Sequence, residues 1–188
     1  MSPLEIAAAV FSALSVLFTV RRSLWLWPTG LIGTALYFVV FLQARLYGSA
    51  GLQVFFLVIQ LYGWWWWARG KAGEEPPIAR LPRRAVLLTA LAAVAAAGIA
   101  AWGLTAFTDA RAAPADMLIT TLSIAAQWLL SRKILENWLF WIAVDVLAIG
   151  VYASQGLALT AGLYGLFLAM ACWGLWEWRR SLRAGATA

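Results

Sequence analysis

Four side chains able to bind a small molecule lie close together within residues 125–146 (AAQWLLSRKILENWLFWIAVDV). Asn137, Trp141 and Asp145 follow one another at intervals of four, so on a helix they share one face, with Trp138 beside them. An amide, two indoles and a carboxylate on one face can hold an aromatic ligand by stacking. A cationic ligand would also gain cation–π contact and ion pairing. The spacing therefore predicts a small-molecule binding site.

Asp145 lies well inside an apolar stretch of the chain. A carboxylate in the hydrocarbon of a membrane costs about 2.5–3.5 kcal/mol on insertion scales, so we expect it to face the protein interior or a water-filled cavity. In the alternative interpretation, Asp145 only pairs with a hydroxyl of a neighbouring helix. Trp138 and Trp141 would then belong to an aromatic belt at the membrane boundary.

Other polar side chains also lie inside apolar stretches, and amides, hydroxyls and phenols are common hydrogen-bond partners for ribose and heterocycle groups. Each of them can equally bond to a neighbouring helix, for about 0.6 kcal/mol on average. The candidates for substrate binding, beyond the four residues above, are Tyr37, Gln53, Gln60, Gln127 and Tyr164.

Residues suited to catalysis are scarce in this chain. It has no histidine and a single cysteine, Cys172, which excludes an internal disulfide and histidine-based metal or proton chemistry. No Walker loop and no nucleophile beside a base is present. We therefore expect no enzymatic activity, no cofactor and no metal.

The overall composition is that of an integral membrane protein. Of 188 residues, 64% are hydrophobic and 12% are charged, and the mean hydropathy is +0.81. An ordinary soluble domain is about half apolar and a quarter charged. The net charge of +6 comes from short basic groups between apolar stretches, which is typical of loops that face anionic lipid headgroups rather than of a nucleic-acid surface.

Seven apolar stretches are long enough to cross about 30 Å of hydrocarbon as helices. They are residues 3–20, 24–42, 50–68, 85–107, 115–131, 136–154 and 157–178. If the N-terminus lies outside, 12 of the 14 basic residues fall on the cytoplasmic side, and only Arg45 and Arg111 fall outside. The pattern predicts seven transmembrane helices, with the N-terminus outside and the C-terminus in the cytoplasm.

An internal repeat divides these helices into two groups. Residues 24–67 match residues 135–178 without a gap, at an offset of 111, with 13 identities in 44 positions. We expect a first three-helix repeat (1–68), a cytoplasmic loop (69–84), a linker helix (85–107), a second repeat (108–178) and a cytoplasmic tail (179–188). One linker helix keeps the two repeats in the same orientation, so the fold class is an all-α 3+1+3 parallel repeat with the substrate between the repeats.

The repeat places unlike residues opposite each other in the two halves. Thr34 corresponds to Asp145, and Gly30 corresponds to Trp141. A site formed by both halves would therefore be chemically asymmetric.

Four consecutive tryptophans, Trp64–Trp67, precede Arg69 and Lys71. Consecutive helix residues point about 100° apart, so the four indoles cannot share one pocket. Tryptophan is enriched at the membrane–water boundary. We interpret the run as part of an aromatic belt, with at most one of the four facing a central pore.

Two blocks of the sequence resemble the PnuC family of nicotinamide riboside transporters. They are LQARLYGSAGLQVFFLVIQLYGWWWW and SRKILENWLFWIAVDVLAIGVYASQGLALTAGLYGLFL, and the resemblance covers about residues 5–180. It implies a homotrimeric carrier related to the SWEET sugar transporters. It also implies facilitated diffusion of nicotinamide riboside, retained in the cell by a cytosolic kinase that forms no stable complex with it. The binding residues of the family map onto Gln127, Asn137, Trp138, Trp141, Thr34 and Gln53.

The substrate itself stays open at this point. Many members of the family carry asparagine where this chain has Asp145, and the family also includes relatives that resemble thiamine or riboflavin carriers. Nicotinamide riboside and thiamine both carry a cationic ring that suits a carboxylate, whereas riboflavin is neutral. A membrane scaffold or a membrane-embedded enzyme is the alternative from another functional class.

Overall fold

The structure is a computed structural model that describes residues 3–43, 47–69, 76–107, 114–154 and 158–185. These residues form seven α-helices and no named β-strand. The helices are α1 (Pro3–Val20), α2 (Leu26–Gln43), α3 (Tyr47–Ala68), α4 (Arg83–Phe107), α5 (Pro114–Ser131), α6 (Asn137–Ser154) and α7 (Ala158–Gly185).

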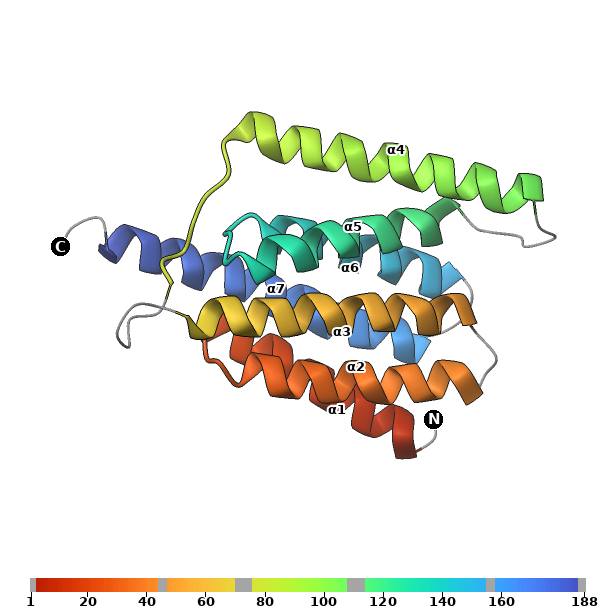
Figure 1. Ribbon diagram of the computed structural model, residues 1–188, viewed down its shortest axis with the longest axis horizontal. Coiled ribbons are helices and arrows are strands. Elements are labelled where there is room, and N and C mark those ends of the chain that lie inside the picture. Colours follow the sequence, from red (N-terminus) through yellow and green to blue (C-terminus); the bar gives the residue numbers. More distant parts are fainter. Residues whose placement is uncertain (1–2, 44–46, 70–75, 108–113, 155–157, 186–188) are drawn as a thin grey trace.

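The seven helices lie side by side along the long axis of the molecule (Figure 1). Within the first three helices, α1 packs on α2 and α2 on α3, and within the last three, α5 packs on α6 and α6 on α7. The two groups meet where α1 contacts α7 and where α3 contacts α5. Helix α4 lies outside both groups and packs on α5 (Figure 1). Apart from the contact of α4 with α5, exchanging α1, α2 and α3 for α5, α6 and α7 leaves this list of contacts unchanged.

The helix ends recur along the chain at a fixed interval. Helices α5, α6 and α7 begin 111 residues after α1, α2 and α3, and α5 and α6 end 111 residues after α1 and α2. The sequence identities place this offset only from residue 24 onward, whereas the helix ends carry it back to Pro3 and Pro114. Both prolines occupy the first position of a helix, where a missing N–H group costs nothing, and an acidic residue follows in the first turn of each helix.

The turn after the first helix of each group has the same unusual backbone. Arg22 has a φ of 56° and Lys133, 111 residues later, has a φ of 55°. In each turn two backbone bonds close the preceding helix in the pattern of a Schellman motif, which places its C′ residue in the left-handed region. The N–H of Arg22 donates to Thr19 (3.0 Å), that of Ser23 to Phe18 (2.9 Å), that of Lys133 to Leu130 (2.8 Å) and that of Ile134 to Leu129 (3.0 Å).

Four buried indoles form the core between the two groups of helices. Trp27 packs edge-on against Trp67, with ring centroids 5.6 Å apart at 84°, and Trp138 packs against Trp178 at 5.6 Å and 89°. Trp67 and Trp178 then meet across the joint at 6.2 Å. All four are at most 3% exposed. Edge-to-face contacts of this kind stabilise a core beyond the apolar area that they bury.

Further contacts tie this joint to the two Schellman turns. Trp178 Nε1 donates a hydrogen bond to the carbonyl oxygen of Thr19 on α1 (3.1 Å). The Lys133 ammonium lies 4.5 Å from the centre of the Trp67 ring, as a cation–π contact requires. Lys133 is only 1% exposed, so its side chain lies within the protein.

Two glycines make room for the indoles of α2 and α6. A Cβ atom on Gly63 of α3 would overlap the ring of Trp27, and one on Gly174 of α7 would overlap the ring of Trp138. The backbones of α3 and α7 therefore lie directly against the indoles. No larger residue fits at either position without moving a helix.

The segment between α3 and α4 is attached to the turn between α5 and α6. The N–H of Ala79 donates to the carbonyl oxygen of Lys133 (3.0 Å), and the N–H of Leu135 donates back to Ala79 (2.9 Å). The two bonds form an isolated parallel β-bridge between Ala79 and Ile134. The start of α4 is thereby fixed to the second group of helices.

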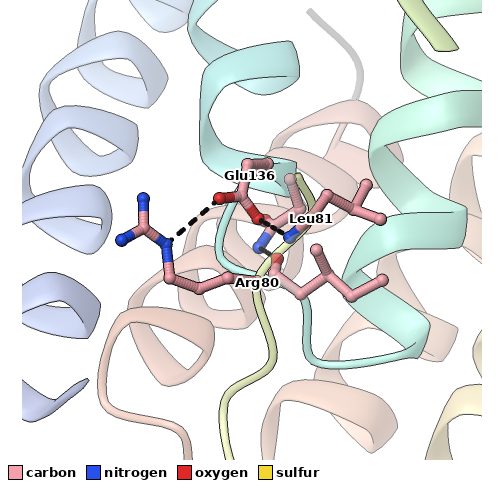
Figure 2. A network of polar contacts seen from close by, with 5 residues as sticks. Arg80, Leu81 and Glu136 are labelled. Atoms are coloured by element: carbon pink, nitrogen blue, oxygen red, sulfur yellow. Dashed lines mark hydrogen bonds and ion pairs between the residues drawn. The ribbon is translucent and has the colours of Figure 1, made fainter. Parts of the chain in front are cut away.

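Glu136 adds side-chain contacts to this attachment (Figure 2). Its carboxylate accepts a hydrogen bond from the N–H of Leu81 at 2.9 Å, and Arg80 Nε lies 3.4 Å from the other carboxylate oxygen. The Glu136 side chain is 6% exposed, whereas that of Arg80 is 66% exposed. The ion pair therefore contributes little, and the partly buried bond to Leu81 is the stronger of the two contacts.

The outer surface of the helices is strongly apolar. Leu88, Ile99 and Trp102 of α4 are each about two-thirds exposed. By length and composition, three described segments can cross a membrane on their own: Pro3–Val20, Arg83–Gly103 and Asn137–Ser154. In α2, the apolar stretch Leu26–Val40 is shorter than the 18 residues that such a segment needs.

The four consecutive tryptophans divide between the surface and the core. Trp64 and Trp65 are 37% and 49% exposed, Trp66 is partly buried against the core, and Trp67 is buried. Arg69 lies over the ring of Trp65, with Cζ 3.8 Å from its centre. This arrangement agrees with the prediction that the run does not form one pocket.

We expect Gly63→Ala and Gly174→Ala to destabilise the protein by about 1–3 kcal/mol each, because each added methyl group overlaps an indole. Gly51→Ala on α3 and Gly165→Ala on α7 are the matched controls, since a Cβ at either site meets nothing within 4 Å. Melting temperatures in one detergent would measure the effect. Equal melting temperatures for test and control variants would contradict the glycine contacts.

We expect Glu136→Ala to release the segment before α4, because the partly buried N–H of Leu81 then loses its charged acceptor, at a cost of about 1 kcal/mol. Trypsin should cleave after Arg80 faster than in the unchanged protein. Glu177→Ala is the control, since the described contacts of the attachment do not involve Glu177. Cleavage after Arg80 at the same rate in both variants would show that Glu136 does not hold the segment.

Candidate functional site

A cavity of about 280 Å³ lies between the two groups of helices. Helices α1, α2, α3, α5, α6 and α7 all contribute to its wall, and α4 does not. Its lining residues are Ser12, Ser15, Val16, Thr19, Leu26, Trp27, Gly30, Thr34, Phe56, Gln60, Ser123, Gln127, Leu130, Trp138, Trp141, Val144, Asp145, Tyr164, Phe167 and Ala171.

Most of the wall consists of pairs of residues whose numbers differ by 111. The pairs are Ser12/Ser123, Val16/Gln127, Thr19/Leu130, Trp27/Trp138, Gly30/Trp141, Thr34/Asp145, Phe56/Phe167 and Gln60/Ala171. The cavity is therefore centred where corresponding faces of the two groups meet. Three pairs have identical residues, and the other five differ in size or polarity.

The wall from α6 combines indoles with a carboxylate. Trp138 and Asp145 are 1% and 4% exposed, and Trp141, between them in the sequence, also faces the cavity. Among the residues that the structure describes, none forms a hydrogen bond or an ion pair with the Asp145 carboxylate. A buried carboxylate is costly in an apolar setting unless a cation or hydrogen-bond donors reach it. This part of the wall is therefore suited to a flat, positively charged group.

The wall from the first group of helices carries hydroxyl and amide groups instead. Gln60 Nε2 donates to Thr34 Oγ1 at 2.7 Å, which links α3 to α2. Ser15 Oγ donates to the carbonyl oxygen of Leu26 at 2.8 Å, which links α1 to α2. Gln60 is 7% exposed. Ser15 Oγ can still accept a hydrogen bond, and the Gln60 amide retains a second N–H to donate, so these groups suit a ligand with hydroxyl groups.

Gly30 determines how far these polar groups extend into the cavity. A Cβ atom there would lie 2.6 Å from Gln60 Oε1 and 2.8 Å from Ser15 Oγ, closer than carbon and oxygen can approach. The corresponding residue of the second group is Trp141. One half of the cavity is therefore narrowed by an indole, and the other half is open to an amide and a hydroxyl group.

Seven of the ten residues predicted from the sequence line the cavity. They are Thr34, Gln60, Gln127, Trp138, Trp141, Asp145 and Tyr164. Asn137, Tyr37 and Gln53 do not line it. Asn137 is the first residue of α6, and its Nδ2 donates to the carbonyl oxygen of Ile134 (2.6 Å), so its amide is directed at the turn.

Several lining residues were not among the predicted ones. Ser12, Ser15 and Thr19 form a hydroxyl-bearing face of α1, and Trp27 and Gly30 belong to α2. The signal for the first three was present, because their spacing of three and four residues places them on one helix face. Within the described residues, no three His, Cys, Asp or Glu side chains are grouped closely enough to hold a metal ion.

Comparison with known proteins gives one family match over nearly the whole chain. Residues 2–180 match the model of the family described as nicotinamide mononucleotide transporter. The riboflavin/roseoflavin transporter RibM of Streptomyces davaonensis is 31% identical over 84% of this chain and 76% of its own length. The nicotinamide riboside transporter PnuC of Escherichia coli is 29% identical over 82% of this chain and 75% of its own length.

A solved structure has the same fold as this chain. It is described as the crystal structure of the vitamin B3 transporter PnuC, and it matches with a TM-score of 0.79 at 25% sequence identity. The match covers 96% of this chain and 82% of the chain in the crystal. The helical arrangement described above is therefore that of a solved transporter.

Proposed function

The chain belongs to the nicotinamide mononucleotide transporter family, the PnuC family, and is a membrane transporter; we propose that its substrate is nicotinamide riboside. The observation that carries this proposal is the Asp145 carboxylate, which lines the cavity next to two indoles. The nicotinamide ring of nicotinamide riboside carries a fixed positive charge on its ring nitrogen. That ring matches the chemistry of the α6 wall.

In this proposal the ring binds between Trp138 and Trp141 with its charged nitrogen toward Asp145. Stacking on indoles and cation–π attraction both favour a flat cation at this position. Asp145 adds a full opposite charge away from bulk water, where electrostatic attraction is less screened.

The ribose then lies toward the first group of helices. Ser12, Ser15 and Gln60 offer hydroxyl and amide groups there, and the missing side chain of Gly30 lets Ser15 and Gln60 lie against α2. Ribose hydroxyl groups need partners that both donate and accept, which these side chains are. The two unlike halves of the cavity thus match the two unlike parts of a nucleoside.

Riboflavin is the second candidate, because the relative RibM, described as a riboflavin/roseoflavin transporter, is 31% identical. Two features of the cavity favour nicotinamide riboside over it. The isoalloxazine ring system of riboflavin has three fused rings, whereas a volume of about 280 Å³ is at the small end of ligand pockets. Riboflavin is also neutral and gains no ion pair with Asp145.

We also propose that transport is facilitated diffusion, with the substrate retained by a cytosolic kinase that forms no stable complex with the transporter. The resemblance of the sequence to the PnuC family supports both points. Proteoliposomes without an ion gradient should then equilibrate the substrate across the membrane. Uptake that stops when a proton or sodium gradient is removed would contradict this proposal.

The proposed topology is seven membrane-spanning helices in a 3+1+3 parallel repeat, with the N-terminus outside the inner membrane and the C-terminus in the cytoplasm. Support comes from helices of at least 18 residues, which span about 27 Å or more, and from the offset of 111 between helix ends. The segregation of basic residues supports the orientation. Reporter fusions at the two termini test it, and a C-terminal fusion that is active only outside would contradict it.

We further propose a homotrimer, as the family resemblance implies. The exposed apolar residues of α4 offer a surface that either lipid or a second copy can cover. Native mass spectrometry of the detergent-purified protein tests this proposal, and a monomer at all detergent concentrations would contradict it.

We expect nicotinamide riboside to quench the tryptophan fluorescence of the purified protein saturably, because two cavity indoles would contact its ring. Thiamine and riboflavin, titrated in the same way, are the comparison ligands. Saturable quenching by riboflavin alone would overturn the substrate and keep the transporter. No response to any of the three would leave the cavity without support as a vitamin site.

We expect Asp145→Asn to weaken nicotinamide riboside binding by about 10- to 100-fold, the equivalent of roughly 1.5–3 kcal/mol for a contact with a charged partner. Asp116→Asn is the matched control, because Asp116 is exposed in the first turn of α5 and does not line the cavity. Isothermal titration would measure both variants. Unchanged affinity in Asp145→Asn would exclude Asp145 as the counter-ion.

A further inference from the structure

A second hollow lies on the outside of α7, near its C-terminal end. It has a volume of about 360 Å³ and is lined by Cys172, Leu175, Trp176, Arg179, Arg180 and Arg183. These residues are spaced by three or four along one helix, so they form a single face. We refer to them as the α7 groove.

The end of the α7 groove nearer the C-terminus of α7 is strongly basic. The Arg180 guanidinium lies 5.6 Å from the centre of the Trp176 ring, which orients it over the indole. Among the described residues, neither Arg179 nor Arg180 forms an ion pair, and both are exposed. Guanidinium groups bind phosphate oxygens with paired, charge-assisted hydrogen bonds.

The other end of the groove, toward the middle of α7, is apolar. Trp176 is 57% exposed, and Leu175 and Cys172 continue the same face toward the middle of α7. Tryptophan prefers the boundary between hydrocarbon and headgroups. In the topology proposed above, the groove therefore passes from an apolar floor to three arginines at the level of the lipid headgroups.

The end of α7 extends beyond its neighbours, which leaves this face open. Helix α7 continues seven residues past the expected end of the span at residue 178, to Gly185. In Figure 1 its last turns project past the ends of the helices beside it. Arg179, Arg180 and Arg183 all lie in this extension.

We propose that the α7 groove binds one anionic phospholipid. The guanidinium groups of Arg179 and Arg180 hold its phosphate, Arg183 adds positive charge beside them, and one acyl chain lies along Leu175 and Trp176 toward Cys172. A free phosphate would leave the apolar floor uncovered. A zwitterionic lipid would bring its own cation against three arginines, so the charge of the groove selects an anionic headgroup. This inference does not depend on the identity of the transported substrate.

The test is native mass spectrometry of the delipidated full-length protein, titrated with phosphatidylglycerol or with phosphatidylethanolamine. We expect the first phosphatidylglycerol to bind at least about fivefold more tightly than phosphatidylethanolamine. The triple variant Arg179→Gln/Arg180→Gln/Arg183→Gln should lose this preference. The triple variant Arg21→Gln/Arg83→Gln/Arg84→Gln removes the same charge at exposed positions elsewhere and should keep it.

Three outcomes would overturn the proposal. The first is equal binding of the two lipids, and the second is an equal loss of preference in both triple variants. The third is dissociation of an oligomer in the α7 variant, because a second copy of the chain would then be the occupant of the groove. A second measurement does not need the variants to fold. Cys172 is the single cysteine of the chain and is exposed, so an environment-sensitive fluorophore on it should respond to phosphatidylglycerol and not to phosphatidylethanolamine.

Discussion

The contact on which the rest of the structure depends is an indole packed against a glycine. Trp27 lies against the backbone of α3 at Gly63, and Trp138 lies against the backbone of α7 at Gly174. Trp27 also packs against Trp67, and Trp138 packs against Trp178. Trp67 and Trp178 then contact each other where the two groups of helices meet. Because a protein interior is close-packed, a shift at such a contact also displaces the neighbouring side chains. The glycine contacts fix how closely α2 lies to α3 and how closely α6 lies to α7, and the contact between Trp67 and Trp178 fixes how the two groups meet.

Polar groups also contact the indoles where the two groups of helices meet. Trp178 donates to the backbone of α1, and the Lys133 ammonium lies over Trp67, so indoles provide both hydrogen-bonding and cation-binding contacts inside an otherwise apolar core. The segment before α4 is attached to this same turn at Ala79 and Glu136. Helix α4, which packs only on α5 among the helices, is thereby held at its start to the turn that carries Lys133. A displacement of that turn would move the core and the outer helix together.

Much of the fold follows from the sequence, and the parts that do not have definable physical causes. Hydropathy identified all seven helices, but α7 continues to Gly185, because arginine and leucine propagate a helix as well as apolar residues do. The spacing of four that predicted Trp141 and Asp145 also selected Asn137. There the rule fails, because Asn137 begins the helix and its amide faces the preceding turn. Ser12, Ser15 and Thr19 were missed because serine and threonine in apolar helices commonly bond to their own backbone, as Thr19 does to Ser15. Whether Tyr37 or Gln53 faces the cavity depends on helix rotation, which the sequence of one helix does not specify.

The differences between the two halves matter more for chemistry than their likeness. The cavity lies where corresponding faces of the two groups of helices meet. If the residues on these faces were identical, the cavity would have two equivalent ends. Exchange of Gly30 for Trp141 and of Thr34 for Asp145 at corresponding positions makes one end aromatic and anionic and the other open and hydrogen-bonding. The packing contacts that the two halves share, namely those of the four indoles and the two glycines, lie at other positions. Trp138 takes part in both the shared packing and the cavity wall, because it packs against Trp178 in the core and also lines the cavity. The unlike residues at positions 30/141 and 34/145 therefore change the chemistry of the cavity around a packing contact that both halves share.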